Sequence, residues 1–349
     1  MKKILVIIIL FAFYNANCQK DKTLVGVPEN KSNHKKNTPE GMTFIPMGSY
    51  SILRVPGDST SKVTKSVQAF YMSQEVTNKE YRQYMDWLKS HPDDTLSWVY
   101  IDHKAMTKPY ENDTTTEGWK SRRQSRIKII NVLTKDIKPI DLSVWDEFKD
   151  DNCYELYKNY FTDPAFDNFP VVGVSWENAR LFCQWKTKML NDKALADGKE
   201  YYNDVRLPAI EEWEYASACG FTGKDKNIKK QITLKDGREY LNQIPLFPSV
   251  SNKKNLYGLY NLNQNVAEWT SNSYDESAYL SSNSGDLSPD YFYEAKPGDP
   301  PALKRKLVTG DSWFKKNEGL QFEYQDKARA FIGFRYVTTY YVPSSNIYY

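Results

Sequence analysis

The chain has few side chains that could hold a redox metal. Its 349 residues include three histidines and four cysteines, and none of them stand at a Cys-x-x-Cys or His-x-x-x-His spacing. Zinc and other transition metals need clustered thiolate or imidazole ligands. The sequence also contains no phosphate-binding loop and no recognisable Ser/His/Asp set. It therefore gives no direct support to metal-assisted, nucleophilic or phosphoryl-transfer chemistry.

A large net charge and a long apolar run are also missing beyond the first residues. The formal net charge is +3, and Lys2 and Lys3 supply two of these units, so a chain without its leader is nearly neutral. This balance gives no electrostatic reason to expect a nucleic-acid partner. The apolar residues 4–13 follow the two lysines and are too few for a stable membrane anchor. We interpret residues 1–18 as a signal peptide and expect an exported protein.

The leader ends in Tyr-Asn-Ala-Asn-Cys, which leaves two interpretations open. In the first, Cys18 becomes the acylated first residue of a lipoprotein, although Asn17 stands where a small residue is usual. In the second, ordinary cleavage occurs close to Cys18. Residues 19–40 are polar and predict a flexible tether. One domain is expected over residues 41–349.

Three cysteines remain in the predicted domain, namely Cys153, Cys183 and Cys219. In an oxidising compartment they would allow one disulfide and one free thiol. Cys183 and Cys219 lie among apolar residues of expected helices. Buried free thiols that pack as small hydrophobic groups are the favoured interpretation for these two.

Three helices are expected within an otherwise irregular chain. Residues 75–91 begin with Thr77 and Glu80 at the spacing of a capping box, and residues 175–190 begin with Ser175 as the N-cap. Residues 206–220 place Pro208 in a first turn and end at Gly220. Beyond Gly220 the helical periodicity stops. Helices among short strands and many turns predict a loop-rich α+β fold.

The third helix carries three glutamates that invite an acid–base interpretation. No histidine or second carboxylate motif accompanies them. Helix caps and a solvated face are therefore the preferred interpretation. The three residues are Glu211, Glu212 and Glu214.

Residues 255–272 form the most specific stretch. Asn261, Asn263, Asn265 and Glu268 place several oxygen donors within eight residues of a turn-forming sequence. Calcium prefers such side-chain and backbone oxygens. An Asn-rich turn whose side chains bind their own backbone is the alternative.

Six ordered segments together resemble the formylglycine-generating enzyme (sulfatase-modifying factor) domain. They are EVTNKEY, FPVVGVSWENARLFCQW, RLPAIEEWEYA, GLYNLNQNVAEWTS, GDSW and IGFR, and they extend over nearly all of residues 41–340. The resemblance implies a single loop-rich α+β domain related to C-type lectins. It also implies a structural calcium ion held by the side chains of Asn261 and Glu268 and by the backbone oxygens of Gln264 and Val266.

Further segments resemble the GldK/PorK branch of that family, which are gliding-motility and type IX secretion lipoproteins of Bacteroidota. These segments are DPAFDNFPVVGVSW, AEWTSNSYDESAY and GDPPALKRKLVTGDSW, and the insertion at about residues 91–165 resembles that branch as well. The resemblance implies a ring at the periplasmic face of the outer membrane. Its implied partners are a GldN/PorN-like protein, copies of this chain or a GldK-like paralogue, and the membrane through a lipid on Cys18.

The chain departs from the oxidase members at their reactive centre. Those members are similar to one another in a copper-binding cysteine pair that follows an Arg-Gly-Gly-Ser-Trp turn, whereas residues 307–337 here contain no cysteine. Thr309, Asp311 and Tyr336 stand at three positions of the family pattern. A related iron-dependent branch uses histidines that this chain lacks. We therefore expect no copper, no iron and no enzyme activity.

What remains of this region is expected to be structural. Ser312 and Trp313 are expected to anchor a core strand, and Arg335 is expected to pair with a buried carboxylate. The preferred function is a non-enzymatic assembly protein that uses residues 91–165 and 273–301 as its interaction surface. A glycan- or peptidoglycan-binding module is the alternative, and a divergent oxidase is the less favoured third interpretation.

Overall fold

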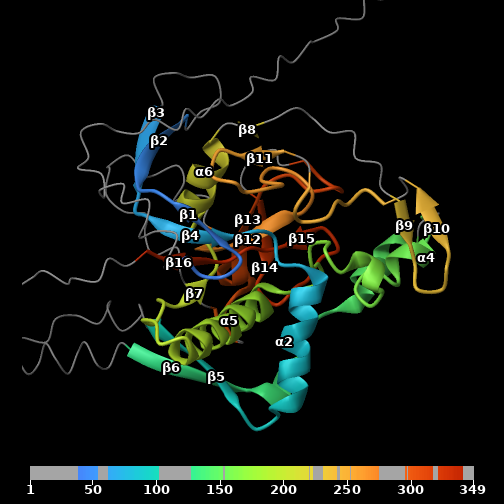
Figure 1. Ribbon diagram of the computed structural model, residues 1–349, viewed down its shortest axis with the longest axis horizontal. Coiled ribbons are helices and arrows are strands. Elements are labelled where there is room, and N and C mark those ends of the chain that lie inside the picture. Colours follow the sequence, from blue (N-terminus) through green and yellow to red (C-terminus); the bar gives the residue numbers. More distant parts are fainter. Residues whose placement is uncertain are drawn as a thin grey trace, which may run out of the picture.

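The structure is a computed structural model with both helices and sheets, as the sequence predicts (Figure 1). It describes residues 38–53, 62–101, 127–151, 154–219, 221–222, 231–241, 244–251, 253–274, 295–296, 298–316 and 321–340. The predicted signal peptide with Cys18, most of the tether, Cys153, Gly220 and most of residues 273–301 lie outside these ranges. No helix in the described ranges combines the length and apolar character that a membrane crossing requires.

Two four-stranded sheets form the centre of the fold (Figure 1). The first has the order β1-β4-β16-β7 and joins the first described strand to the last, with all three pairings antiparallel. The second has the order β14-β13-β12-β15, in which only β12 and β15 run parallel. The strands are β1 (Met42–Ile45), β4 (Phe70–Ser73), β7 (Val205–Arg206), β12 (Ala267–Ser273), β13 (Arg305–Thr309), β14 (Gln321–Tyr324), β15 (Ile332–Gly333) and β16 (Val337–Thr339).

Shorter elements surround these sheets. The two-stranded pairs are β2 (Gly48–Leu53) with β3 (Lys62–Val67), β5 (Thr95–Ile101) with β6 (Ile127–Leu133), β8 (Phe221–Thr222) with β11 (Lys254–Asn255), and β9 (Gln231–Thr233) with β10 (Glu239–Leu241). The short helices are η3 (Thr134–Asp136), η4 (Leu142–Phe148), α4 (Tyr154–Tyr157), η5 (Pro164–Phe166) and η6 (Pro301–Lys304). The expected insertion thus contributes the β5–β6 hairpin, η3, η4 and α4.

Helix α2 (Asn78–Ser90) begins as expected but with half of its predicted capping box. The Thr77 hydroxyl accepts a hydrogen bond from the Glu80 backbone N–H at 3.2 Å. The Glu80 carboxylate instead accepts from Lys186 at 2.6 Å and from the Tyr336 hydroxyl at 3.1 Å. A lysine from another helix therefore binds the Glu80 carboxylate, which the local pattern predicts to cap the start of α2.

The other two expected helices are also present. Helix α5 (Trp176–Ala196) has Ser175 as its N-cap, and it continues beyond the predicted end. Helix α6 (Ile210–Ala218) begins after Pro208, so the expectation of proline in the first turn is wrong. Glu212 caps this helix by accepting from the Ala209 N–H at 2.8 Å. Glu214 is mostly buried and accepts from the Tyr50 hydroxyl at 2.6 Å, so it does not belong to a solvated face.

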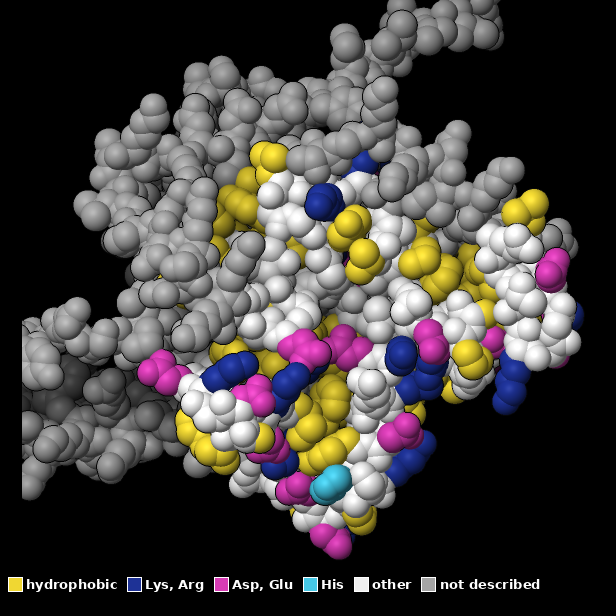
Figure 2. All heavy atoms as spheres, in the orientation of Figure 1, with side chains coloured by type: hydrophobic (Ala, Val, Ile, Leu, Met, Phe, Trp, Pro, Cys, Tyr) yellow, Lys and Arg dark blue, Asp and Glu magenta, His cyan; other side chains and the backbone are white. Residues whose placement is uncertain are grey.

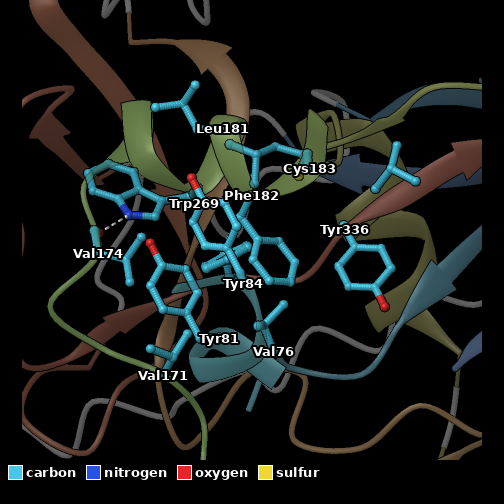
Figure 3. Packing of buried hydrophobic residues seen from close by; sticks show 14 of the residues in the cluster. Val76, Tyr81, Tyr84, Val171, Val174, Leu181, Phe182, Cys183, Trp269 and Tyr336 are labelled. Carbon is cyan, nitrogen blue, oxygen red and sulfur yellow. Dashed lines mark hydrogen bonds between the residues drawn. The ribbon is translucent and has the colours of Figure 1, made fainter. Parts of the chain in front are cut away.

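The main hydrophobic core lies where α2 and α5 pack on the sheets (Figure 3). The rings of Tyr81 and Phe182 stack with centroids 5.5 Å apart, and Tyr84 meets Phe182 edge-on at 5.6 Å. Trp269 on β12 donates to the Val174 carbonyl at 3.0 Å. Cys183 is a buried free thiol, as the sequence predicts, and Cys219 is buried just after α6. Burial raises the pKa of the Cys183 thiol, which keeps it protonated and unreactive.

Trp313 packs against a second core cluster and does not lie in a core strand, where we expected it. Trp313 follows β13 in a turn and stacks on Trp145 of η4 with centroids 6.0 Å apart. Its indole N–H donates to the Ala330 carbonyl at 3.1 Å, while the Ser312 hydroxyl accepts from the Lys315 N–H at 2.9 Å. Trp313 therefore joins the turn to the insertion, while Ser312 closes the turn itself, and the expected role in a strand of the main core is wrong.

Candidate functional site

A buried ion pair lies between the two central sheets. Arg335 stands between β15 and β16 and is fully buried. Its Nε donates to Glu268 Oε2 and its Nη2 donates to Glu268 Oε1, both at 2.7 Å. The Trp213 indole N–H of α6 also donates to Oε2, at 2.8 Å. The predicted pairing of Arg335 with a buried carboxylate is confirmed, and its partner is Glu268 of β12.

Two backbone carbonyls accept further hydrogen bonds from the guanidinium. Nη1 donates to the Ser73 carbonyl at 3.3 Å and Nη2 to the Tyr260 carbonyl at 3.1 Å. Arg335 therefore connects the end of β4, the Asn-rich turn and β12. A planar fork of donors suits such a buried junction, where lysine would leave acceptors unsatisfied.

A second buried carboxylate lies beside this pair. Glu75 accepts from the Asn261 side-chain amide at 2.8 Å and from that of Asn265 at 3.1 and 3.0 Å. Burial raises the pKa of Glu75 to about 8, which Arg335 opposes and Glu268 reinforces. Two buried carboxylates, Glu75 and Glu268, therefore share the surroundings of one guanidinium.

The Asn-rich turn has a backbone that explains its composition. Asn261, Asn263 and Asn265 have φ angles of 59°, 67° and 74°, in the left-handed region that asparagine tolerates better than most residues. The side chains of Asn261 and Asn265 bind Glu75 and the backbone of residues 247–249. The turn therefore binds other segments of the chain rather than only its own backbone.

The predicted calcium ligands do not form a calcium cage as they are arranged here. Both carboxylate oxygens of Glu268 bind Arg335, and a guanidinium 2.7 Å away would repel a divalent cation. The Asn261 amide nitrogen is directed at Glu75. The calcium site at Asn261, Gln264, Val266 and Glu268 stays a prediction, and it requires Glu268 to exchange Arg335 for the ion.

The three positions that depart from the oxidase pattern have structural contacts. Tyr336 is buried. Its hydroxyl donates a hydrogen bond to Glu80, and its backbone N–H donates to Ser73 Oγ at 2.9 Å. Thr309 ends β13 opposite Glu268. Asp311 lies in the turn after Gly310. Within the described ranges, no group of three or more His, Cys, Asp or Glu residues could hold a metal ion.

An open pocket of about 400 Å³ lies next to the buried cluster, and no pattern in the sequence predicts it. Ser73, Glu75 and Tyr336 line it from the sheet side, and α2 and α5 line it from the other. Figure 2 shows acidic and basic side chains gathered together across this face, around a hydrophobic patch near α2 and α5. The lining comes from segments distant in the chain, so no local motif could reveal it.

Comparison with known proteins gives a consistent match. Residues 27–340 match the sulfatase-modifying factor enzyme 1-like domain. The chain is 25% identical over 216 residues to the inactive C-alpha-formylglycine-generating enzyme 2 of Bos taurus. This alignment covers 57% of this chain and 58% of that protein. It is 29% identical over 129 residues to the formylglycine-generating enzyme of Streptomyces coelicolor, which covers 33% and 36%.

The structure of PvdO from Pseudomonas aeruginosa aligns with 86% of this chain and 94% of its own length. The TM-score is 0.43 and the identity is 14%. The sequence alignments extend over little more than half of the bovine protein and about a third of the bacterial one.

Proposed function

Because the chain belongs to the sulfatase-modifying factor enzyme 1-like family, we propose that it is a non-catalytic member that serves as a structural component of the type IX secretion and gliding apparatus of Bacteroidota. It lies at the periplasmic face of the outer membrane, held by a lipid on Cys18 or by its partners. It packs there beside copies of itself, a GldK-like paralogue or a GldN/PorN-like protein. Its single domain is related to C-type lectins.

The observation that carries the non-catalytic conclusion is the chemistry of residues 307–337. Tyr336 replaces a family cysteine, and its hydroxyl is used within the fold by Glu80. Copper(I) requires soft sulfur ligands, which tyrosine cannot supply. The match to a relative named as inactive supports the same conclusion. The resemblance to the GldK/PorK branch supports the assembly role.

A turnover assay tests the non-catalytic conclusion. The purified protein is incubated with copper(I), a cysteine-containing peptide and oxygen, and the peptide is followed by mass spectrometry. We expect no product beyond that of a copper-only control. Repeated turnover with stoichiometric copper or iron on the protein would contradict the proposal.

Photo-cross-linking in intact envelopes tests the assembly role. Leu142 of η4 and Leu133 of β6 are exposed large hydrophobic residues of the insertion, at 49% and 40% of their surface. A photoreactive phenylalanine at either position is expected to capture a GldN/PorN-like protein or a second copy of the chain. The matched control is Leu195 near the end of α5, which is 63% exposed and lies outside the insertion. Capture no stronger at 142 and 133 than at 195 would refute this surface.

Two simpler measurements address the anchor and the metal. Mass spectrometry of the mature N-terminus is expected to find a diacylated or triacylated Cys18, and an unmodified terminus near residue 18 would rule the anchor out.

For calcium, the arrangement of Glu268 and Arg335 leads us to expect that chelation leaves the melting temperature unchanged. A fall on chelation that calcium reverses and magnesium does not would support the calcium site instead.

A further inference from the structure

The pocket beside the buried cluster has a wall that is mostly apolar. Met189 and Leu190 of α5 contribute to this wall, and so does Val250 of the loop that precedes β11. Val250 is 62% exposed. Apolar side chains that line an open pocket are typical of a binding site, and a volume of about 400 Å³ is within the range of such sites.

Two ion pairs already occupy the charged groups at the mouth of this pocket. Lys186 of α5 binds Glu80 of α2 at 2.6 Å, and both side chains are mostly buried. Lys193 of α5 binds Glu40, which precedes β1. An occupant with a charge of its own would have to separate one of these pairs, whereas an uncharged segment leaves both intact. The lining therefore favours an uncharged, apolar occupant.

The first described residues of the chain lie at this pocket. Glu40 and Gly41 line it, and Pro39 is buried just before them. The Pro39 carbonyl accepts a hydrogen bond from the Met42 N–H at 3.2 Å. The ion pair of Glu40 with Lys193 adds a second contact, which connects this segment to α5. The preceding residues of the chain therefore begin near the mouth of the pocket.

The chain just upstream contains one uncharged apolar stretch. Residues 24–28 have the sequence Leu-Val-Gly-Val-Pro, whereas the rest of residues 19–37 is polar. The family match begins at residue 27, so it includes the end of this stretch. Residues 28–37 can extend roughly 33 Å, while Lys186 and Lys193 at the pocket mouth are separated by roughly 10 Å along the axis of α5. The stretch can therefore reach the pocket from the point where the described chain begins.

We propose that residues 24–28 fold back into this pocket and place their apolar side chains against Met189 and Val250. Because the segment belongs to the same chain, its effective concentration at the pocket is on the order of 1 mM, so a modest apolar contact is enough for docking. This docking is independent of the assembly role proposed above. With the lipid proposed on Cys18, it leaves only residues 19–23 as a free link, which extends roughly 17 Å, and it turns the side of the domain with α2 and α5 toward the membrane.

Thiol labelling of the full-length mature protein tests the docking. Val250→Cys places a thiol in the pocket wall, and its reaction with a maleimide is followed by peptide mass spectrometry. Val25→Asp together with Val27→Asp makes the segment charged, and we expect this change to speed labelling at position 250 about tenfold because the pocket is then open. Equal labelling rates at position 250 with and without these two substitutions would overturn the proposal.

Leu256→Cys is the matched control for this experiment. Leu256 is 67% exposed and lies outside the pocket, so labelling at this position should not respond to the two aspartates. The rates at position 250 should also be independent of protein concentration. Slower labelling only at high concentration would show that the segment of a second copy enters the pocket, and it would refute docking within one chain.

Disulfide trapping identifies the segment that enters. A cysteine at Leu24, Val25 or Val27 is combined with Val250→Cys, and the protein is oxidised mildly. A disulfide forms only where the two Cα atoms come within about 7 Å of each other. For at least one of the three positions, we expect the intramolecular disulfide in about fivefold higher yield with Val250→Cys than with Leu256→Cys. Equal yields with the two partners at all three positions would refute the assignment.

Discussion

Arg335 connects more of the chain than any local pattern around it suggests. It binds Glu268 with two hydrogen bonds and the carbonyls of Ser73 and Tyr260 with the rest of its guanidinium. Removing two charges from water is expensive, and good geometry only partly offsets that expense. The intact pair therefore contributes little net stability, but removal of one partner alone lowers the free energy of unfolding strongly.

Substitution of Arg335 by methionine is expected to destabilise the fold by roughly 3–5 kcal/mol, because it leaves Glu268 buried without its cation. Urea unfolding followed by tryptophan fluorescence measures this loss. Arg238→Met serves as the control, since Arg238 pairs with Asp236 on the surface. Equal stability of the two variants would contradict the structural role of Arg335.

Lys306 is another buried charged residue with an unusual environment. Its Nζ lies 3.9 Å from the centroid of the Trp176 ring and donates to Ser273 Oγ at 3.3 Å. Burial lowers the pKa of Lys306 to about 7, Arg180 lowers it further, and Glu177 opposes the change. The Trp176 face also favours the charged form.

The pH dependence of stability should reveal this lysine. An unfolded lysine titrates near pH 10.4, so between about pH 7 and pH 10 the unfolded chain holds a proton that folded Lys306 has released. Stability from this residue therefore rises with pH in that window. Lys306→Met removes the effect, so its advantage over the parent should be largest at pH 6 and should shrink toward pH 10. Parallel urea-stability curves for the two proteins would refute the low pKa.

At the scale of elements, β2 and α6 approach each other unusually closely. A Cβ atom at Gly48 would lie 2.3 Å from the Tyr215 hydroxyl oxygen of α6. Tyr50, two residues further along β2, donates to Glu214 of the same helix. Glycine at this position allows the strand to reach the helix, and the hydrogen bond fixes the contact.

Gly48→Ala is expected to destabilise the protein by roughly 1–3 kcal/mol, because the added methyl group forces the strand and helix apart. Adding Tyr215→Phe should recover part of this loss by removing the nearest atom, although it also removes the hydrogen bond from Tyr257. Thermal melting measures both variants. Gly298→Ala, with open space around its Cβ position, is the control and should be neutral.

Local signals located the helices better than they located the strand pairings. The N-cap residues Thr77 and Ser175 act within one turn, so their effect is visible in a short stretch of sequence. Successive strands β1 and β2 nonetheless pair with β4 and β3 and not with each other. Strand pairing depends on contacts between distant segments. The ion pair of Glu80 with Lys186, which replaces the expected bond of Glu80 to its own helix start, depends on such contacts as well.

At the scale of the whole molecule, the chain closes on itself. The sheet that contains β1 also contains β16, and the main core cluster includes residues from Met42 to Tyr336. No early or late portion of the described chain completes that sheet alone. That residues 41–349 form one domain stays a prediction.

A single cooperative unfolding transition is therefore expected. Calorimetry should give one peak whose calorimetric and van't Hoff enthalpies agree, and near- and far-ultraviolet circular dichroism should change together. Removal of residues 337–349 deletes β16 and should abolish that transition, because β4 and β7 both pair with β16. Two separate transitions would show that the chain contains more than one folding unit.

The sequence by itself determined the mixed fold class, the three long helices, the family signature and the lack of metal-binding thiolates after β13. These properties depend on residue type and on spacing over a few positions. Only the tertiary structure decided that Glu268 is the partner of Arg335, that Glu75 joins Asn261 from 186 residues away, and that α2, α5 and the sheet enclose an open pocket. Folding selects such partners through burial and long-range packing, which no short stretch of sequence encodes.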